Sequence, residues 1–434
     1  MGNATSILKQ NYDSPRWTNE IFDCSMPMTF DTYSKCSYHC LYCFSFNQKA
    51  HCLHGYDSSK YTPEIRSVNP AKVIKLFDSA LAGDDSDISQ AYSQFFPYIQ
   101  ARRIMQWGGL ADGFDEWERR FGVTLELLKY FDSIDYPLSF STKGAWWTKD
   151  ARYMDLFRRH THNWHVKISI ITADQEKAHA IEKGVPTPEQ RLDAIKRLAD
   201  IGVHVTLRLR PFIIGVSSDW QELISRAKQS GADSVTTEFF CMESRADEEM
   251  KARYAEMSEV CNFDIWEIYQ NYSNQQGYKR LNRQIKAPII YAMRDYCHQL
   301  GMRFHVSDAH CRECNDACNC CGVPPEWNVS QRGHIGEAVI IAREKGFVRF
   351  SNIADGVNDF FGGFRWYIAE GFNKTNQAKA ARFYSTTMAE FIRNNWNNIY
   401  SGTSPAKAYD GILIPHDVDE NGDVVYRYNE KMRR

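Results

Sequence analysis

The chain contains 434 residues, of which 43% are hydrophobic and 24% are charged, and its formal net charge is −2. These values are typical of a globular protein, and they exclude a strongly basic protein that binds nucleic acid through its overall charge. Residues 1–12 do not resemble a signal peptide and no apolar run is long enough to span a membrane, so we expect a cytoplasmic protein with no membrane association.

Residues 26–242 alternate short strand-like runs with amphipathic helical stretches, a pattern typical of a parallel sheet. Strands are expected at residues 26–33, 103–107, 138–142, 165–171, 203–210 and 234–239. Helices are expected at residues 70–81, 116–131, 149–159, 188–201 and 219–230, the last two capped by Thr187 and Ser218. Repeated crossovers of this kind predict an α/β protein with a partial (βα)6 barrel over residues 26–245, after an N-terminal extension at 1–25. The chemistry is then expected at the carboxyl ends of the strands.

Three cysteines lie directly after the first predicted strand, at Cys36, Cys40 and Cys43. A loop with this spacing suits three irons of a 4Fe-4S cluster, and the missing fourth protein ligand leaves one iron open. An open iron can chelate the amino and carboxylate groups of S-adenosylmethionine, and one electron from the reduced cluster then frees a 5′-deoxyadenosyl radical. The alternative is a zinc site completed by His39, although zinc favours paired cysteines two residues apart.

The C-x3-C-x2-C spacing, with the aromatic Tyr42 before the last cysteine, resembles the signature of the radical S-adenosylmethionine (radical SAM) superfamily. Gly-Gly-Leu-Ala-Asp at 108–112, Tyr-Pro-Leu-Ser-Phe-Ser-Thr-Lys at 136–143 and Arg-Leu-Arg-Pro-Phe at 208–212 resemble the branch that contains spore photoproduct lyase and DNA-repair-photolyase-like proteins. The resemblance covers residues 26–242. It implies a radical SAM barrel, a 4Fe-4S cluster, S-adenosylmethionine, and an electron donor such as flavodoxin or ferredoxin.

Residues at several predicted strand ends match the positions that bind S-adenosylmethionine in this superfamily. Gly108 and Gly109 would let the backbone approach the methionyl amine, and Lys143 would pair with the methionyl carboxylate. For the glycines, a plain turn is the alternative. The expected cofactor-binding residues are Tyr42, Gly108, Gly109, Ser141, Lys143, Ser169 and Arg210.

The expected catalytic residues are Lys143, Arg210, Glu238 and Cys241. Arg210 and Glu238 end the fifth and sixth predicted strands, where a salt bridge at the rim is the alternative. The lyase has a hydrogen-donating cysteine soon after its second strand, and this chain has Gly109 at that position. Cys241, near the expected barrel mouth, is the candidate substitute donor, with a buried inert thiol as the alternative.

A helical segment is expected over residues 247–300, and a second cysteine group follows it, so residues 246–323 are interpreted as a helical segment with a metal site. The group consists of Cys311, Cys314, Cys318, Cys320 and Cys321. In a reducing cytoplasm such a group binds metal more often than it forms disulfides. The pair Cys311 and Cys314, with two of the remaining thiols, would hold zinc or a second 4Fe-4S cluster, and the spacing does not separate these metals. An unliganded thiol-rich loop is the other alternative.

Residues 324–434 are predicted to form a C-terminal α+β extension that binds substrate or a partner. Strand-like runs lie at residues 338–341 and 411–415. A hairpin is expected over residues 415–428, because Asn421-Gly422 is a strong turn dipeptide.

The branch resemblance implies radical chemistry on a nucleic-acid base, with a modified pyrimidine in DNA as the leading hypothesis. The reaction would be a lyase, isomerase or other base-modifying reaction. Candidate DNA contacts are the arginine pairs at 102–103, 119–120 and 158–159, and the aromatic residues Trp146, Trp147, Trp366 and Tyr367. The alternatives are a radical SAM enzyme that modifies a peptide or small molecule with an auxiliary cluster, and a non-catalytic metal-stapled binding module.

A run of three histidines, His160, His162 and His165, lies at a predicted helix-to-strand junction. No acidic or thiol neighbour stands in register with it along the sequence. We therefore expect these histidines to face solvent or to cap the helix.

Overall fold

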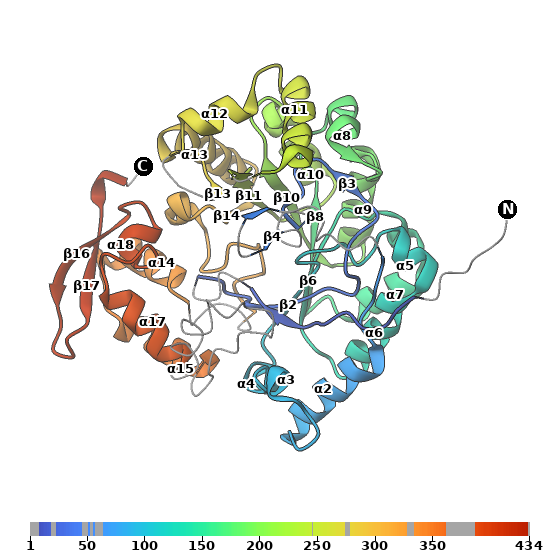
Figure 1. Ribbon diagram of the computed structural model, residues 1–434, viewed down its shortest axis with the longest axis horizontal. Coiled ribbons are helices and arrows are strands. Elements are labelled where there is room, and N and C mark those ends of the chain that lie inside the picture. Colours follow the sequence, from blue (N-terminus) through green and yellow to red (C-terminus); the bar gives the residue numbers. More distant parts are fainter. Residues whose placement is uncertain are drawn as a thin grey trace.

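The computed structural model of the protein describes residues 8–18, 23–45, 51–52, 55–56, 64–244, 246–273, 278–327, 334–361 and 387–432. Its main sheet has eight strands in the order β1-β2-β6-β7-β8-β10-β11-β14 (Figure 1). These strands are β1 (Arg16–Trp17), β2 (Met28–Phe30), β6 (Met105–Trp107), β7 (Leu138–Thr142), β8 (Trp164–Ser169), β10 (His204–Phe212), β11 (Ser234–Phe239) and β14 (Arg303–Val306). Strand β1 is antiparallel to β2, and every other neighbouring pair is parallel.

Helices connect each parallel strand to the next and lie outside the sheet (Figure 1). They are α2 (Pro70–Ala82), α3 (Gln90–Ser93), α4 (Phe96–Gln100), α5 (Glu116–Phe121), α6 (Val123–Ser133), α7 (Ala151–Arg159), α8 (Gln175–Ile181), α9 (Pro188–Asp200), α10 (Trp220–Gln229), α11 (Glu248–Cys261), α12 (Ile265–Asn271) and α13 (Arg283–Gln299). Because consecutive parallel strands are also neighbours in space, the crossovers all proceed in one direction, as in a barrel. Within the described residues the sheet remains open between β1 and β14.

The predicted α/β class and the six predicted parallel strands are confirmed. The sheet contains a seventh parallel strand, β14, which the sequence does not predict because its four residues stand between a long helix and a cysteine-rich loop. The helix expected over residues 116–131 is divided into α5 and α6 by Gly122, which has a φ of 69°. Thr187 caps α9 as expected, but Asp219 precedes α10 after a 3-10 turn, so Ser218 is not its cap.

Side chains along the strands alternate between two faces of the sheet. The outer face is apolar and packs against the helices. Phe140 of β7, for example, lies in ring contact with Trp107 of β6, Trp164 of β8 and Phe157 of α7. These buried aromatic contacts join three neighbouring strands to the helix layer and fix the outer wall of the sheet.

The opposite, inner face of the sheet is polar although it is buried. Ser139 of β7 is 3.0 Å from His165 of β8, whose Nε2 is 2.7 Å from the Thr206 hydroxyl of β10. That hydroxyl is in turn 2.7 Å from the Ser234 hydroxyl of β11. Hydrogen bonds therefore link four strands across the inner face, and His165 belongs to this buried network and does not face solvent as expected.

The C-terminal region contains α14 (Gly336–Lys345), β15 (Phe347–Val348), α15 (Ser351–Phe361), α17 (Met388–Asn397), α18 (Pro405–Ala408), β16 (Leu413–Val418) and β17 (Val424–Tyr428). Strands β15, β17 and β16 form a small antiparallel sheet, drawn at the left of Figure 1. Helix α14 contacts the 3-10 helix η4 (Ala309–Cys314), and α15 contacts α4. The region thus lies beside both the segment after β14 and the segment before β6.

Two sequence predictions for this region have different outcomes. The hairpin is confirmed, since β16 and β17 pair and Gly422 turns between them with a φ of 78°. The strand-like run at residues 338–341 is wrong, because these residues lie inside α14. Ala338, Val339 and Ile340 are all buried in that helix, so the apolar run reflects burial rather than strand pairing.

Asp23 links the two edges of the main sheet. Its carboxylate accepts hydrogen bonds from Arg312, which follows β14, and from Tyr409, which follows α18, each at 2.5 Å.

Three short antiparallel pairs complete the fold: β3 (His39–Cys40) with β9 (Glu182–Lys183), β4 (His51–Cys52) with β5 (Gly55–Tyr56), and β12 (Met242–Glu243) with β13 (Tyr278–Lys279). None of the helices in the described ranges is long and apolar enough to cross a membrane.

Candidate active site

The first cysteine group forms a loop at the carboxyl end of β2. Part of this loop is β3, in which Cys40 pairs with Glu182 of β9. The Cys43 amide donates to the Cys40 carbonyl at 3.2 Å, and this turn brings Cys43 back towards Cys40. Cys40 is buried, and Cys36 and Cys43 are partly exposed. The thiols therefore sit where the sequence predicts chemistry, at the carboxyl edge of the parallel sheet.

The zinc alternative for this loop is not supported by the geometry. His39 is exposed and is adjacent to Cys40 in an extended strand, where neighbouring side chains point to opposite faces. A tetrahedral zinc ion with thiolates at 2.3 Å holds its sulfur atoms about 3.8 Å apart. Among the described residues, no three of these cysteine and histidine ligand atoms lie within 4.8 Å of one another. The loop does not have the compact shape of a closed zinc site.

The buried ion pair of Glu182 and Arg191 supports the cysteine loop. The Tyr42 hydroxyl donates to Glu182, and Glu182 is paired with Arg191 of α9 at 2.7 Å. Arg191 also donates to the Ser169 carbonyl at the end of β8, again at 2.7 Å. The carboxylate of Glu182 and the guanidinium of Arg191 are at most 1% exposed. This network connects two of the predicted cofactor-binding residues, Tyr42 and Ser169, through two residues that the sequence analysis did not identify.

The Gly108-Gly109 turn at the end of β6 folds around a second buried carboxylate. Asp31, which directly follows β2, accepts hydrogen bonds from the amides of Leu110 and Ala111 at 2.7 and 2.9 Å. Gly108 has a φ of 87°, and a Cβ atom there would lie 2.3 Å from the Ser141 carbonyl. Only glycine fits this position, because both the backbone angle and the approach to β7 exclude a side chain.

Asp112 connects this turn to the end of β7. Its carboxylate accepts from the Thr142 hydroxyl at 2.7 Å and from the Lys143 amide at 2.6 Å. Ser141, one residue before Thr142, is buried, and its hydroxyl has no hydrogen-bond partner among the described residues. A buried polar atom without a partner is unusual in a folded protein. It fits a site that a polar ligand completes.

Lys143 brings positive charge to the cysteine loop. Its ammonium lies 5.7 Å from the centre of the Tyr42 ring, and its charge acts on both Cys36 and Cys40. Burial, with the neighbouring Cys43 and Asp115, raises the pKa of Cys36 to about 12, and the lysine opposes this shift. Lys143 is therefore close to the predicted cluster, as expected for a residue that pairs with an anionic group there.

The remaining predicted residues lie at the carboxyl ends of the next strands. Arg210 of β10 and Glu238 of β11 form an ion pair, and Arg210 also donates to the Ser307 hydroxyl at 3.2 Å. Cys241 follows β11 and contacts the Phe239 carbonyl at 3.5 Å, and burial raises its pKa to about 12. The rim salt bridge considered for Arg210 and Glu238 is thus present, and the catalytic roles of all three residues stay predictions.

Two further cations lie on the inner face below this rim. Lys167 of β8 is 1% exposed and donates to the Ser139 hydroxyl at 3.0 Å, and burial lowers its pKa. Arg208 of β10 donates to the Ser169 hydroxyl at 3.3 Å. Burial and the neighbouring Arg210 lower the pKa of Arg208 to about 10. The inner face therefore favours a bound anion.

The second cysteine group is divided between two places in the core. Cys311 and Cys314, in η4, pack into the main hydrophobic core. Cys320 and Cys321 pack into a separate small apolar group with Met26, Ile104 and Val323. No three of the five thiols lie within 4.8 Å of one another in the described part of the chain. The predicted metal at Cys311, Cys314, Cys318, Cys320 and Cys321 stays a prediction.

The loop that carries Cys320 and Cys321 fills part of the inner face. Thr236 of β11 donates to the Cys320 carbonyl at 2.7 Å, and the Cys321 sulfur lies 4.0 Å from the Gln106 side chain of β6. A hydrogen bond from Cys321, together with Arg312, lowers the pKa of Cys320. The sequence placed this loop outside the barrel region, whereas the structure brings it against the strands.

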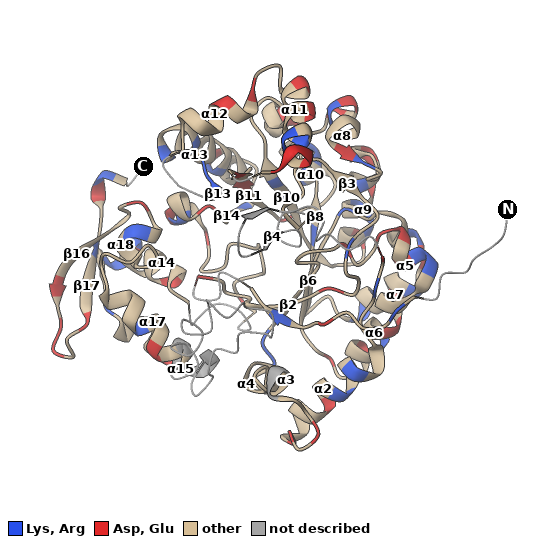
Figure 2. Cartoon of the chain, in the orientation of Figure 1, with Lys and Arg blue, Asp and Glu red and all other residues tan. Residues whose placement is uncertain are grey.

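Most of the candidate DNA contacts are unsuited to that role. Arginines are paired locally with acids, as in Arg119–Glu116, Arg158–Asp155 and Arg159–Asp132, and the outer helices carry both signs of charge (Figure 2). Residues 102–103 and 158–159 precede β6 and β8, which puts them at the amino ends of the strands, away from the cysteine loop. Trp147 is buried against Phe114, while Trp366 and Tyr367 lie outside the described residues. Trp146, with the Arg119 guanidinium 5.0 Å from its ring, lies near the carboxyl edge.

Comparisons with known proteins give distant similarities. No family model matches the chain. Uncharacterised proteins of Mycobacterium tuberculosis and Mycobacterium bovis are 22% identical to this chain over 243 residues. The matched region covers 53% of this chain and 66% of each relative, so the chain spans just under two thirds of the relatives' length.

Solved structures with partial similarity include spore photoproduct lyase. A cysteine-to-serine mutant of that lyase has a TM-score of 0.48 and 15% identity, over 69% of this chain and 80% of the lyase. SuiB of Streptococcus suis, bound to the precursor peptide SuiA, has a TM-score of 0.40 and 14% identity, over 65% of this chain and 49% of SuiB. Because both TM-scores are below 0.5, we base the proposed function on the residues of this chain.

Proposed function

We propose that the protein is a radical SAM enzyme in which Cys36, Cys40 and Cys43 bind three irons of a 4Fe-4S cluster. The observation that carries this proposal is the position of the three-thiol loop at the carboxyl edge of the parallel sheet. The donor set fits the group, because the three thiols belong to one loop and lie close enough to act on one another electrostatically, while His39 is exposed. When bound, the cluster would supply the electron that cleaves the sulfonium bond of S-adenosylmethionine.

The chain's own residues would then bind and orient S-adenosylmethionine. Gly108 lets the turn after β6 approach the Ser141 backbone closely, and the unpartnered Ser141 hydroxyl offers a polar group to the methionyl end. Lys143, beside Tyr42, offers a cation to the methionyl carboxylate. Ser169 and Arg210 extend this site along β8 and β10, with Glu238 orienting Arg210. Cys241 is proposed as a hydrogen donor near the rim.

Anaerobic reconstitution with iron and sulfide, followed by an assay for 5′-deoxyadenosine with dithionite as reductant, tests this proposal. Wild type is expected to bind a cluster and form 5′-deoxyadenosine, and Cys40→Ala is expected to form none. Cys261→Ala is the matched control, since Cys261 is another buried cysteine, at the end of α11. A wild-type protein that binds zinc only and leaves S-adenosylmethionine intact would overturn the proposal in favour of a metal-stapled binding module.

We propose a nucleic-acid base, with a modified pyrimidine in DNA as the leading case, as the substrate. Support comes from the two cations on the inner face, Lys167 and Arg208, which favour a phosphate-bearing substrate, and from Trp146 as a stacking group near the rim. A base within a duplex would have to flip out to reach this site.

Flavodoxin or ferredoxin is the proposed electron donor. The proposed location is the cytoplasm, a reducing compartment that suits free thiols.

Binding of a fluorescent DNA duplex to the reconstituted enzyme tests the substrate class. We expect the DNA affinity of wild type to fall steeply with added salt, and the affinity of Trp146→Ala to be lower than that of wild type. The control is Tyr400→Ala, which removes an exposed aromatic residue elsewhere and should leave the DNA affinity unchanged. If DNA does not bind and iron analysis gives about eight irons per chain rather than four, the second cysteine group holds an auxiliary cluster. That result would favour the peptide or small-molecule modifying enzyme.

A further inference from the structure

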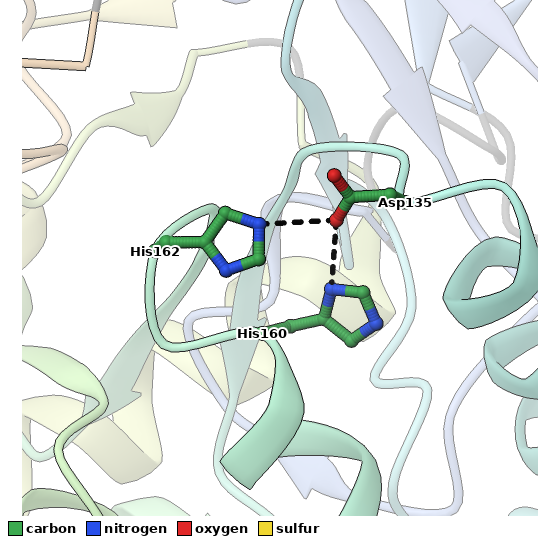
Figure 3. A group of neighbouring side chains, drawn as sticks. All are labelled: Asp135, His160 and His162. Atoms are coloured by element: carbon green, nitrogen blue, oxygen red, sulfur yellow. Dashed lines mark hydrogen bonds and ion pairs between the residues drawn. The ribbon is translucent and has the colours of Figure 1, made fainter.

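Three side chains converge at the amino ends of β7 and β8, on the edge of the sheet opposite the cysteine loop. They are Asp135, His160 and His162, and their nearest ligand atoms all lie within 4.8 Å of one another (Figure 3). One carboxylate oxygen, Asp135 Oδ1, is 3.2 Å from His160 Nδ1 and 3.1 Å from His162 Nε2. Along the sequence, these two histidines have no acidic neighbour in register. In the structure, Asp135 from the turn between α6 and β7 is that neighbour.

We propose that Asp135, His160 and His162 form a binding site for a divalent transition-metal ion, with zinc as the best match. Zinc binds imidazole nitrogen at 2.0–2.1 Å and carboxylate oxygen at 2.0–2.2 Å, so neighbouring ligands in a tetrahedral site are about 3.3 Å apart. The two observed contacts of Asp135 Oδ1 are close to that spacing. Two imidazoles and one carboxylate are also a donor set that zinc favours, with water in the fourth position.

The surroundings of His160 support a metal ion on its Nδ1 atom. His160 Nε2 is 2.8 Å from Asp132 Oδ1, while Nδ1 faces Asp135 and the Asn163 side-chain oxygen, each at 3.2 Å. A neutral imidazole carries one N–H, so it cannot donate on both sides. With a metal on Nδ1, the Nε2–H donates to Asp132 and every polar atom of the ring is satisfied. This carboxylate–histidine–metal arrangement is common around bound zinc.

The ligands are held in position by the protein itself. Arg159 fixes Asp132 with hydrogen bonds of 2.7 and 2.9 Å. Trp164 stacks on the His160 ring with centroids 4.3 Å apart. Arg102 donates to the carbonyls of Ile134 and Asp135, both at 2.6 Å, and so holds the turn from which Asp135 projects. The turn is thus fixed without a metal, which reduces the entropic cost of binding one.

The exposure of the ligands indicates a surface site with a buried anchor. The His160 side chain is 5% exposed, whereas those of Asp135 and His162 are 60% and 58% exposed. Metal can therefore enter from solvent. The site joins the turn before β7 to the turn before β8, so a bound ion would connect two consecutive units of the sheet and would take no part in the proposed radical chemistry.

Titration of the full-length protein with Zn²⁺ tests this proposal, after the 4Fe-4S cluster has been reconstituted so that the first cysteine group is occupied. Zinc bound per chain and the zinc affinity are measured for wild type, His162→Ala, Asp135→Asn and His179→Ala. His179 is an exposed histidine on α8 outside the site and serves as the control. Zinc bound by other cysteines is common to all four proteins and cancels in the comparison.

We expect wild type and His179→Ala to bind one zinc ion more than His162→Ala, or to bind it at least tenfold more tightly, and Asp135→Asn to resemble His162→Ala. Zinc should also raise the thermal midpoint of wild type more than that of His162→Ala. Equal zinc content, affinity and thermal shift in wild type and His162→Ala, including no binding in either, would overturn the proposal and leave a hydrogen-bonded cluster only. Because His162 and Asp135 are exposed, their variants are expected to fold.

Discussion

Arg191→Met is the substitution that most sharply tests how the cysteine loop is held. Arg191 pairs with Glu182 at 2.7 Å, and both side chains are at most 1% exposed. The substitution leaves the Glu182 carboxylate buried with the Tyr42 hydroxyl as its remaining side-chain partner. It also removes the hydrogen bond to the Ser169 carbonyl. Two elements of the proposed site, the cysteine loop and the end of β8, lose a common support.

The expected cost follows from the burial of this pair. Removing one partner of a buried salt bridge costs about 3–5 kcal/mol, and the low end applies here because Tyr42 still donates to Glu182. A loss of about 3 kcal/mol corresponds to a roughly 150-fold change in the unfolding equilibrium.

Urea unfolding of the reduced apoprotein, followed by tryptophan fluorescence, measures this effect. The matched control is Arg197→Met on the same helix, since Arg197 forms an exposed pair with Asp193 and its loss is expected to cost less than about 1 kcal/mol. Glu182→Gln added to Arg191→Met should recover part of the loss by removing the unpaired charge. Equal unfolding midpoints for Arg191→Met and Arg197→Met would refute the view that the buried pair supports the loop.

Two further predictions concern the turn after β6 and the start of α5. Gly108→Ala should destabilise the protein by clearly more than Gly122→Ala, because the new Cβ would meet the Ser141 carbonyl at 2.3 Å, whereas Gly122 has open space at a similar positive φ. The same substitution should weaken S-adenosylmethionine binding. Unfolding midpoints and equilibrium binding measure the two effects, and equal midpoints for the two variants would contradict the reasoning. Burial and Asp112 raise the pKa of Asp115 to about 7 in the folded protein, above its unfolded value of about 3.8, so this carboxyl contributes stability at low pH that is lost as pH rises towards 7. Asp115→Asn should therefore flatten the dependence of the apoprotein's unfolding midpoint on pH between 4 and 7, and an unchanged slope would show that Asp115 is not its source.

The sequence predicts the sheet well because its signals are local. Period-two alternation and capping residues such as Thr187 predict strands and helices without knowledge of the tertiary structure. Strand β14 escapes this reasoning because it stands between a long helix and a cysteine-rich loop. The run at residues 338–341 is misread because the first part of α14 is buried on all sides and shows no polar face that would reveal its period. Apolar runs of this length do not distinguish strand from helix.

The candidate site is predictable where spacing alone carries the chemistry, as at Cys36, Cys40 and Cys43. The acids that support it act on partners distant in sequence: Asp31 on residues 79 and 80 positions away, Asp112 on residues 30 and 31 positions away, and Glu182 on Tyr42, 140 positions away. A lone acid, or an arginine such as Arg191, gives no signal of its partner. Gly-Gly-Leu-Ala-Asp does contain Asp112, and its place after the glycines is the one local hint. The Asp135 site is missed for the same reason, since its acid and its histidines belong to different β–α units.

The electron paramagnetic resonance spectrum of the reduced, reconstituted protein, recorded before and after addition of S-adenosylmethionine, tests the central claim most directly. Three cysteine ligands leave one iron open, so the account predicts a 4Fe-4S signal that changes when the amino and carboxylate groups of S-adenosylmethionine bind that iron. The change should be absent in Cys40→Ala and retained in Cys261→Ala. A 4Fe-4S signal that S-adenosylmethionine leaves unaltered in wild type, or a protein that takes up zinc in place of iron, would contradict the account.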